Sequence, residues 1–214
     1  MPAVLSGIES TMSAARLVRF TPQNGNKNHG LRTYVWNARL CEEFYIPLQF
    51  TEVAFRNGIH RRLQAVYGRD WHANPKLLAT LPHRHRADLN EVASSETAKR
   101  GPAFTIDHVV GGLPFGFWHS LMGHSLAHIL WKYGIRGPFP HLPMTENRQT
   151  VFDKLEMMRK FRNNVMHHYA IFDKGPMTEY HNILALLGWM CPHTLWLVKE
   201  LSNPAAVLQR RPQL

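Results

Sequence analysis

Apolar residues recur every three or four positions through most of this 214-residue chain, which is the spacing that buries one face of an α-helix. Between Pro47 and Gly68, for example, one row of this pattern holds Leu48, Phe55 and Ile59. No convincing run of residues alternates between apolar and polar, as a half-buried strand does. The pattern therefore predicts an all-α fold in one domain, a bundle of helices whose ends are set by glycine and proline.

Proline, glycine and polar residues divide the chain into expected segments. Helices are expected over residues 4–20, 31–45, 48–67, from 75 into the nineties, 114–132, 146–167 and 178–200. Residues 21–30 and 134–144 should form loops, and residues 202–214 should be frayed. The chain is thus expected to contain an N-terminal helix and polar loop (1–30), a helical domain (31–200) and a flexible tail (201–214).

Three residues should set particular helix boundaries. Pro47 should kink or restart the helix in which it lies, because proline has no backbone N–H to donate. Pro82 should break the helix that begins at Pro75, and Thr145 should cap the helix that follows it. The apolar segment 114–132 should be a helix in the core.

The chain has 25 lysine and arginine residues against 15 acidic ones, a formal net charge of +10 at pH 7. Such a surface attracts polyanions, so RNA is the expected partner. The basic residues do not form the cluster typical of membrane binding, and no apolar run is long enough to span a bilayer. The first residues also lack the apolar stretch of a secretory signal. We therefore expect a cytoplasmic protein without a membrane partner.

Cysteine usage narrows the class of protein further. The chain has two cysteines, Cys41 and Cys191. Two cysteines so far apart in sequence exclude a disulfide-rich secreted scaffold and a four-cysteine zinc site.

The segment RNNVMHH, residues 162–168, is the most informative for function. On the helix expected there, the apolar residues Val151, Leu155, Met158 and Val165 form a row, and Arg162 occupies the missing place in it. A guanidinium in an apolar row is costly unless it has a partner or faces a cleft. The arginine could therefore reach a carboxylate on a neighbouring helix, extend outward to solvent, or serve a site.

The other polar residues of this segment could act with that arginine. Asn163 and His167 are four residues apart and share a helix face, whereas Arg162 and His167 are five apart, about 140° around the helix. The last two can converge only if the helix ends or bends near the histidine, or if a second copy supplies the partner. An imidazole can transfer a proton and a guanidinium can stabilise a phosphoryl group, so RNA, which carries its own 2′-OH nucleophile, could be cleaved without a metal. His168 could help.

Several strings of residues resemble one family. They are WNARLCEEFYIPLQFTEVAFRNGIHRRL, YGRDW, LPFGFWHSL, LEMMRKFRNNVMHHYAIF and LLGWMCP. In this order, over residues 31 to about 198, they are similar to the Abi-like (abortive infection) proteins of bacteria, which belong to the HEPN superfamily. The resemblance implies a HEPN-type helical bundle, here with an N-terminal helical extension. Many such domains are metal-independent ribonucleases.

The same resemblance implies which residues act. The family's motif consists of arginine, a polar residue, three to five others and histidine, and it maps onto Arg162, Asn163 and His167. The resemblance also implies that two such motifs meet at a dimer interface or within a pseudo-dimer, without a cofactor.

An earlier segment, RNGIH, echoes this motif with a spacing one residue shorter. Arg56, Asn57 and His60 could form a second half-site. Because Glu52, Arg56 and His60 are successive i, i+4 neighbours, we favour a salt-bridged helix face that supports the fold over a second half-site.

A zinc site is the main competing interpretation of the histidines. His119, His124 and His128 lie in one apolar segment, and the last two have a spacing that zinc sites use. Because no further ligand is evident nearby, we predict no metal site. The basic string HRHR, residues 83–86, could touch phosphates.

The leading hypothesis is a HEPN-type endoribonuclease that acts in phage defence or as the toxin of a toxin–antitoxin system. It would work as a homodimer, under the control of an RNA or protein antitoxin, and leave 2′,3′-cyclic phosphate and 5′-OH ends. The first alternative is a non-catalytic HEPN module that binds RNA, a nucleotide or a partner protein. The second is a structural dimerisation module.

Overall fold

The computed structural model describes residues 2–23, 25–132 and 134–213, without the side chains of residues 2, 128 and 129. The regular secondary structure of this part of the chain is all helical, without a β-strand, which confirms the all-α prediction. The helices are α1 (Pro2–Met12), α2 (Ala14–Val18), α3 (Lys27–Tyr67), α4 (Pro75–Thr80), α5 (His83–Arg100), α6 (Ile106–Gly112), α7 (Phe115–Ser120), α8 (Ala127–Leu130), α9 (Arg148–Met166), α10 (Pro176–Met190), α11 (Pro192–Leu201) and α12 (Pro204–Gln209). Short 3-10 turns cover Trp71–Ala73, Gly101–Ala103 and His124–Leu126.

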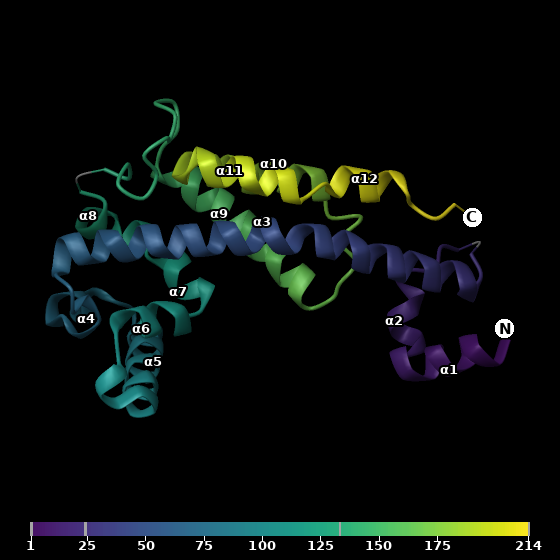
Figure 1. The fold of residues 1–214 in the computed structure, drawn as a ribbon, viewed down its shortest axis with the longest axis horizontal. Helices are drawn as coiled ribbons and strands as arrows, with labels where there is room; N and C mark the ends of the chain where they lie inside the picture. Colours follow the sequence, from purple (N-terminus) through teal and green to yellow (C-terminus); the bar gives the residue numbers. More distant parts are fainter. Residues whose placement is uncertain (1, 24, 133, 214) are drawn as a thin grey trace.

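The long helix α3 runs the length of the molecule and organises the rest (Figure 1). The helices α9 to α12 lie along it, α4 to α7 gather beside its C-terminal half, and α1 and α2 lie at its N-terminal end (Figure 1). Six large side chains of α3 are fully buried against these neighbours: Leu40, Phe44, Leu48, Phe55, Ile59 and Leu63. The core is therefore a continuous cluster built on one face of a single helix.

The ends of α3 follow from local chemistry. Asn26 caps its start by accepting a hydrogen bond from the backbone N–H of His29. Gly68 ends it with φ at 88°, a left-handed value that favours glycine, as the sequence predicted. The start lies inside the expected loop 21–30, and Pro47 does not interrupt the helix. The proline removes one backbone hydrogen bond, while buried side chains on both sides of it continue the packing against the core.

Other expected boundaries are also confirmed. Pro75 is the first residue of α4, and the chain breaks at Pro82 before α5 begins. Residues 134–144 form turns and no helix. In each case proline or glycine residues restrict or loosen the backbone at their own positions, so the local sequence is sufficient to predict the boundary.

Two of the expected helices are each divided into two. Residues 4–20 break at Ser13, whose side chain caps α2 by accepting from the N–H of Arg16. Residues 178–200 break at Cys191, which is extended because the residue before a proline avoids helical geometry. The cap of α9 is Asn147 and not Thr145, because the side chain of Asn147 accepts hydrogen bonds from the backbone N–H groups of Gln149 and Thr150.

The prediction of one helix over 114–132 is wrong. The helix α7 ends at Ser120, turns follow, and only Ala127–Leu130 becomes helical again. Gly123 is extended at the break, and the indole N–H of Trp131 donates 2.9 Å to the carbonyl of Leu121, which satisfies a backbone group freed there. The segment is nevertheless core, as expected, because Trp118, Leu121 and most of its other large side chains are buried.

The C-terminal segment is ordered where fraying was expected. It forms α12, and the carbonyl of Val207 accepts a 2.7 Å hydrogen bond from the indole of Trp36 on α3. Arg211 then lies over the rings of Trp36 and Phe172. Within the described residues, no helix combines the length and the apolar character that crossing a membrane requires.

Candidate functional site

Arg162 lies in the last turns of α9 and faces α3. Its Nε is 3.6 Å from Oε2 of Glu52, and the two side chains are 33% and 24% exposed. A carboxylate on a neighbouring helix is one of the three alternatives that the sequence left open for this guanidinium. The ion pair keeps the arginine at the boundary between the core and the surface.

His167 lies at the C-terminal end of the same helix. It is the first residue after Met166, with φ at −92° and ψ at 10°, and it is exposed. Its ring is 6.1 Å from the ring of Tyr169, and its carbonyl is 3.5 Å from a guanidinium nitrogen of Arg16. The imidazole is thus accessible to a ligand from solvent.

His168 ends the helix by its backbone conformation. Its φ is 57°, in the left-handed region, and it is exposed. The backbone N–H of His167 donates to the carbonyl of Asn163, and that of Tyr169 donates to the carbonyl of Asn164. The helix therefore closes at the candidate histidines, as their convergence with Arg162 would require.

The structure places Arg162 and His167 in different surroundings. The arginine is engaged with Glu52 in the interface of two helices, whereas the histidine lies beyond the helix end. Across the described residues, no hydrogen bond or ion pair joins the two side chains. The half-buried Asn163 lies between them in sequence and shares a helix face with the histidine.

A cavity of about 590 Å³ lies beside this helix end. It is lined by residues of α3 and by the end of α9: Tyr34, Asn37, Ala38, Cys41, Glu42, Tyr45, Ile46, Val165, Met166 and His168. The amide of Asn37 forms one wall and is occupied, because it donates to the carbonyl of Tyr169 and accepts from the N–H of Ile171. Burial raises the pKa of the Cys41 thiol to about 11, so this group is not a nucleophile at neutral pH.

The earlier motif on α3 is divided between two environments. His60 is buried, and its Nδ1 accepts a 3.0 Å hydrogen bond from the indole of Trp71. Burial lowers the pKa of His60, so the neutral ring that accepts this bond is favoured. Arg56 and Asn57 are only partly buried. The hydrogen bond from Trp71 occupies Nδ1 of His60, so this nitrogen is not free to accept a proton from a substrate.

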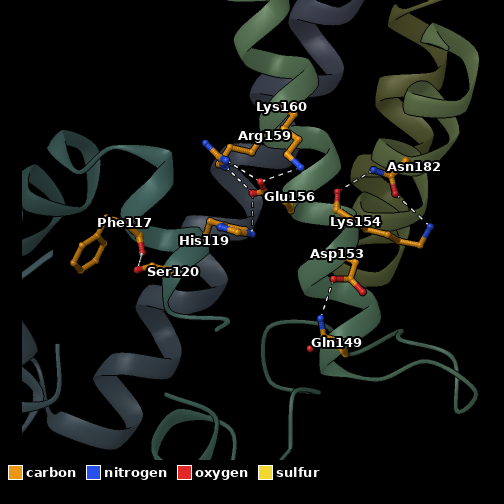
Figure 2. Close-up of polar contacts among 10 residues, drawn as sticks. All are labelled: Phe117, His119, Ser120, Gln149, Asp153, Lys154, Glu156, Arg159, Lys160 and Asn182. Carbon is orange, nitrogen blue, oxygen red and sulfur yellow. Dashed lines mark hydrogen bonds and ion pairs between the residues drawn. The ribbon is translucent and has the colours of Figure 1, made fainter. Parts of the chain in front are cut away.

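A second polar cluster, which sequence reasoning missed, surrounds Glu156 on α9 (Figure 2). Arg159 donates two hydrogen bonds to its carboxylate, at 2.7 and 2.8 Å. Lys160 and Nε2 of His119 lie 3.5 and 3.6 Å from the same group. Hydrogen bonding by Arg159 holds the pKa of Glu156 down to about 2. Arg159 and Lys160 follow Glu156 by three and four residues on one helix, and this spacing is the sequence pattern from which the cluster could have been predicted.

The histidines considered for zinc have separate surroundings. His119 stacks on Phe152, with ring centroids 4.5 Å apart, and burial lowers its pKa. His124 is exposed in a 3-10 turn, and the side chain of His128 lies outside the described residues. In the part of the chain that the structure describes, no three His, Cys, Asp or Glu side chains form a group able to hold a metal ion.

No protein-family model matches this chain, and no curated protein or solved structure matches it either. The similarity to Abi-like proteins therefore stays a prediction from the sequence motifs.

Proposed function

We propose that this protein is a metal-independent endoribonuclease of the HEPN type, with Arg162, Asn163 and His167 in its active site. The position of His167 carries the proposal. It is an exposed imidazole at the end of α9, five residues after an arginine that a carboxylate holds at the edge of the core. Imidazole is the side chain that most often serves as a general acid or base in catalysis, and this one is open to a substrate from solvent.

The proposed reaction needs only these groups and the substrate. The 2′-oxygen of RNA attacks the adjacent phosphorus, and the bond from phosphorus to the 5′-oxygen breaks. His167 takes the proton of the 2′-OH and gives a proton to the leaving 5′-oxygen, so it ends the step as it began, and Arg162 stabilises charge on the phosphoryl oxygens. Asn163 orients these groups and His168 assists. The products are a 2′,3′-cyclic phosphate and a 5′-OH.

A homodimer would complete the site. Residues five apart on a helix point about 140° away from each other, and Arg162 is already directed at Glu52. In the proposed dimer the two copies of the α9 end meet, so that the histidine of one copy serves beside the arginine of its partner. The proposed role is in phage defence or as a toxin, restrained by an RNA or protein antitoxin.

The alternative is a non-catalytic HEPN module that binds RNA, a nucleotide or a partner protein. The ion pair of Arg162 with Glu52 favours this alternative, because it gives the arginine a structural partner without any substrate. Both functions are compatible with the same surface, and turnover distinguishes them.

The decisive experiment is RNA cleavage by the purified protein beside Arg162→Ala and His167→Ala. His193→Ala is the matched control, since His193 is another exposed histidine at a helix end. We expect cleavage to survive EDTA and to fall by about 10²- to 10⁴-fold in His167→Ala, the usual contribution of one general acid or base. The control should cleave like the wild type, and DNA should not be cut.

Three outcomes contradict the enzyme. They are cleavage that EDTA abolishes, products with a 5′-phosphate, and equal cleavage by the wild type and His167→Ala. RNA binding without cleavage would establish the non-catalytic alternative. Growth of cells that express the same variants, with RNA integrity measured on the same samples, tests the proposed toxicity.

A further inference from the structure

Arg56, Arg159 and Arg162 come together at the junction of α3 and α9. Glu52 and Arg56 are one turn apart on α3, and Arg159 and Arg162 are one turn apart on α9, so each pair shares a helix face. The ion pair of Arg162 with Glu52 joins the two faces. Arg56 and Arg159 therefore each lie one helical turn from a member of this ion pair, on the face that carries it.

Two of these arginines have a buried nitrogen that nothing satisfies. The Nε of Arg56 and the Nε of Arg162 are both buried without a hydrogen-bond partner among the described residues. The 3.6 Å from the second of them to Glu52 is an ion pair but exceeds a hydrogen bond. A buried donor without an acceptor is costly, so an acceptor brought by a ligand would find both groups ready to donate.

The third arginine is held in a fixed orientation. Two hydrogen bonds from Arg159 to Glu156 use Nε and one terminal nitrogen, and His119 and Lys160 hold the carboxylate from other sides (Figure 2). The side chain of Arg159 is 35% exposed. A guanidinium fixed in this way loses little conformational entropy when it binds an anion.

The charges at this junction do not balance. Arg56, Arg159, Lys160 and Arg162 are four cations, while Glu52 and Glu156 are the two carboxylates paired among them. The surplus is positive, in a chain whose formal net charge is +10. Guanidinium groups bind phosphate oxygens with paired, charge-assisted hydrogen bonds.

From these observations we infer that Arg56 and Arg159, together with Arg162, form a binding site for the phosphates of a single nucleic-acid strand. The inference rests on the proposed function for its substrate class, and it adds the phosphate contacts beside the cleaved bond. Glu52 and Glu156 orient the guanidinium groups. His60 is outside this site, because Trp71 occupies its Nδ1. Phosphate contacts carry no requirement for a 2′-OH, so single-stranded DNA binds there without being cut.

The test measures binding of a fluorescent single-stranded oligodeoxynucleotide by anisotropy over a series of salt concentrations. The variants are Arg56→Gln and Arg159→Gln. The matched controls are Arg100→Gln and Lys99→Gln, which remove exposed cations paired with Glu96 at the same i, i+4 and i, i+3 spacings. Circular dichroism on each variant confirms that it is folded, and Arg159→Lys provides a milder change at the same position.

Each site variant should bind at least about tenfold more weakly, as expected when one hydrogen bond to a charged group is lost. The slope of log affinity against log salt should become shallower by roughly 0.7 for each phosphate contact removed. Arg159→Lys should keep the slope and still bind more weakly, because an ammonium keeps the charge but loses the fork. The controls should match the wild type.

Site variants that match the controls in affinity and slope would overturn the inference. So would stronger competition by an acidic polypeptide than by the oligonucleotide, which would make the surface a protein-docking site. The inference fails separately from the proposed function. If the site variants bind DNA more weakly but the wild type does not cleave RNA, this inference stands and the proposed enzyme is contradicted. If the wild type cleaves RNA but the site variants bind DNA as the controls do, the enzyme stands and this inference is contradicted.

Discussion

The guanidinium of Arg162 and the carboxylate of Glu52 connect α9 to α3, with 3.6 Å between Nε and Oε2. The pair is neither free in solvent nor fully buried. It links a residue of the proposed catalytic motif to the helix that organises the whole fold. Substituting Glu52 tests what the pair contributes to stability and leaves Arg162 in place.

We predict that Glu52→Gln costs under about 1 kcal/mol of unfolding free energy, because both partners are a quarter to a third exposed and water screens the pair. Urea unfolding measures this change, and high salt should reduce the difference from the wild type. Glu96→Gln, which loses only exposed pairs within α5, is the control. A loss of several kcal/mol would identify the pair as a buried structural element and weaken its proposed place at a substrate site.

The hydrogen bond from Trp71 to His60 predicts a dependence of stability on pH. Burial lowers the pKa of folded His60 below the value near 6.5 that it has in the unfolded chain. The unfolded state therefore binds more protons below about pH 7, and the free energy of unfolding should fall as the pH falls through this range. Denaturant unfolding at several pH values checks the direction.

Substituting His60 tests whether this residue causes the dependence of stability on pH. In His60→Asn the slope of stability against pH should be smaller, while His193→Asn, at an exposed position, should keep the slope of the wild type. The buried His119 also has a lowered pKa, so part of the slope should remain in His60→Asn. An unchanged slope in His60→Asn contradicts the prediction.

Gly58 allows the segment 134–144 to approach α3 closely. A Cβ at this position would lie 3.2 Å from Cβ and 3.4 Å from Cα of Pro138. We predict that Gly58→Leu destabilises the protein by about 1–3 kcal/mol through overpacking, although leucine is the better helix former. Gly111→Leu is the matched control, since a Cβ there meets nothing within 4 Å, and it should be neutral or stabilising by up to about 1 kcal/mol. Urea unfolding compares the two, and a stabilised Gly58→Leu would contradict the close packing.

Local chemistry explains which parts of the fold were predictable from sequence. Gly68, Pro75 and Pro82 act on their own backbone, so the helix boundaries beside them could be derived. The segment 114–132 has large apolar residues throughout its length, and their spacing does not show where the helix ends. At the break Gly123 is extended, and the indole of Trp131 donates to the carbonyl of Leu121, a contact across ten residues that helical spacing does not predict.

The candidate site also has features that the sequence predicts and features that it does not. The sequence shows that Arg162 interrupts an apolar row and needs a partner, a cleft or access to solvent, because its apolar neighbours on α9 are visible in the spacing. It does not show that Glu52 supplies the charge, because that depends on how α3 and α9 are aligned. The bond of His60 to Trp71 was hidden for the same reason, and only the cluster around Glu156 had a local signal in its spacing.

The C-terminal segment packs on α3 through Trp36. Removing residues 203–214 deletes the carbonyl of Val207 that accepts from the indole, and it uncovers a ring that is 5% exposed. We expect a loss of at least about 1.5 kcal/mol, the lower value for exposing one large apolar side chain, and a red shift of tryptophan emission.

Two further variants separate the contributions within this segment. Removing only residues 212–214 keeps α12 and Arg211, and it should change neither stability nor emission. Arg211→Ala keeps the helix and removes the cation that lies 5.6 Å from the centre of the Trp36 ring, which should cost about 0.5–1 kcal/mol. If the longer deletion leaves both the unfolding curve and the emission maximum unchanged, α12 does not contribute to the core in solution, and the fold of residues 27–201 is stable without it.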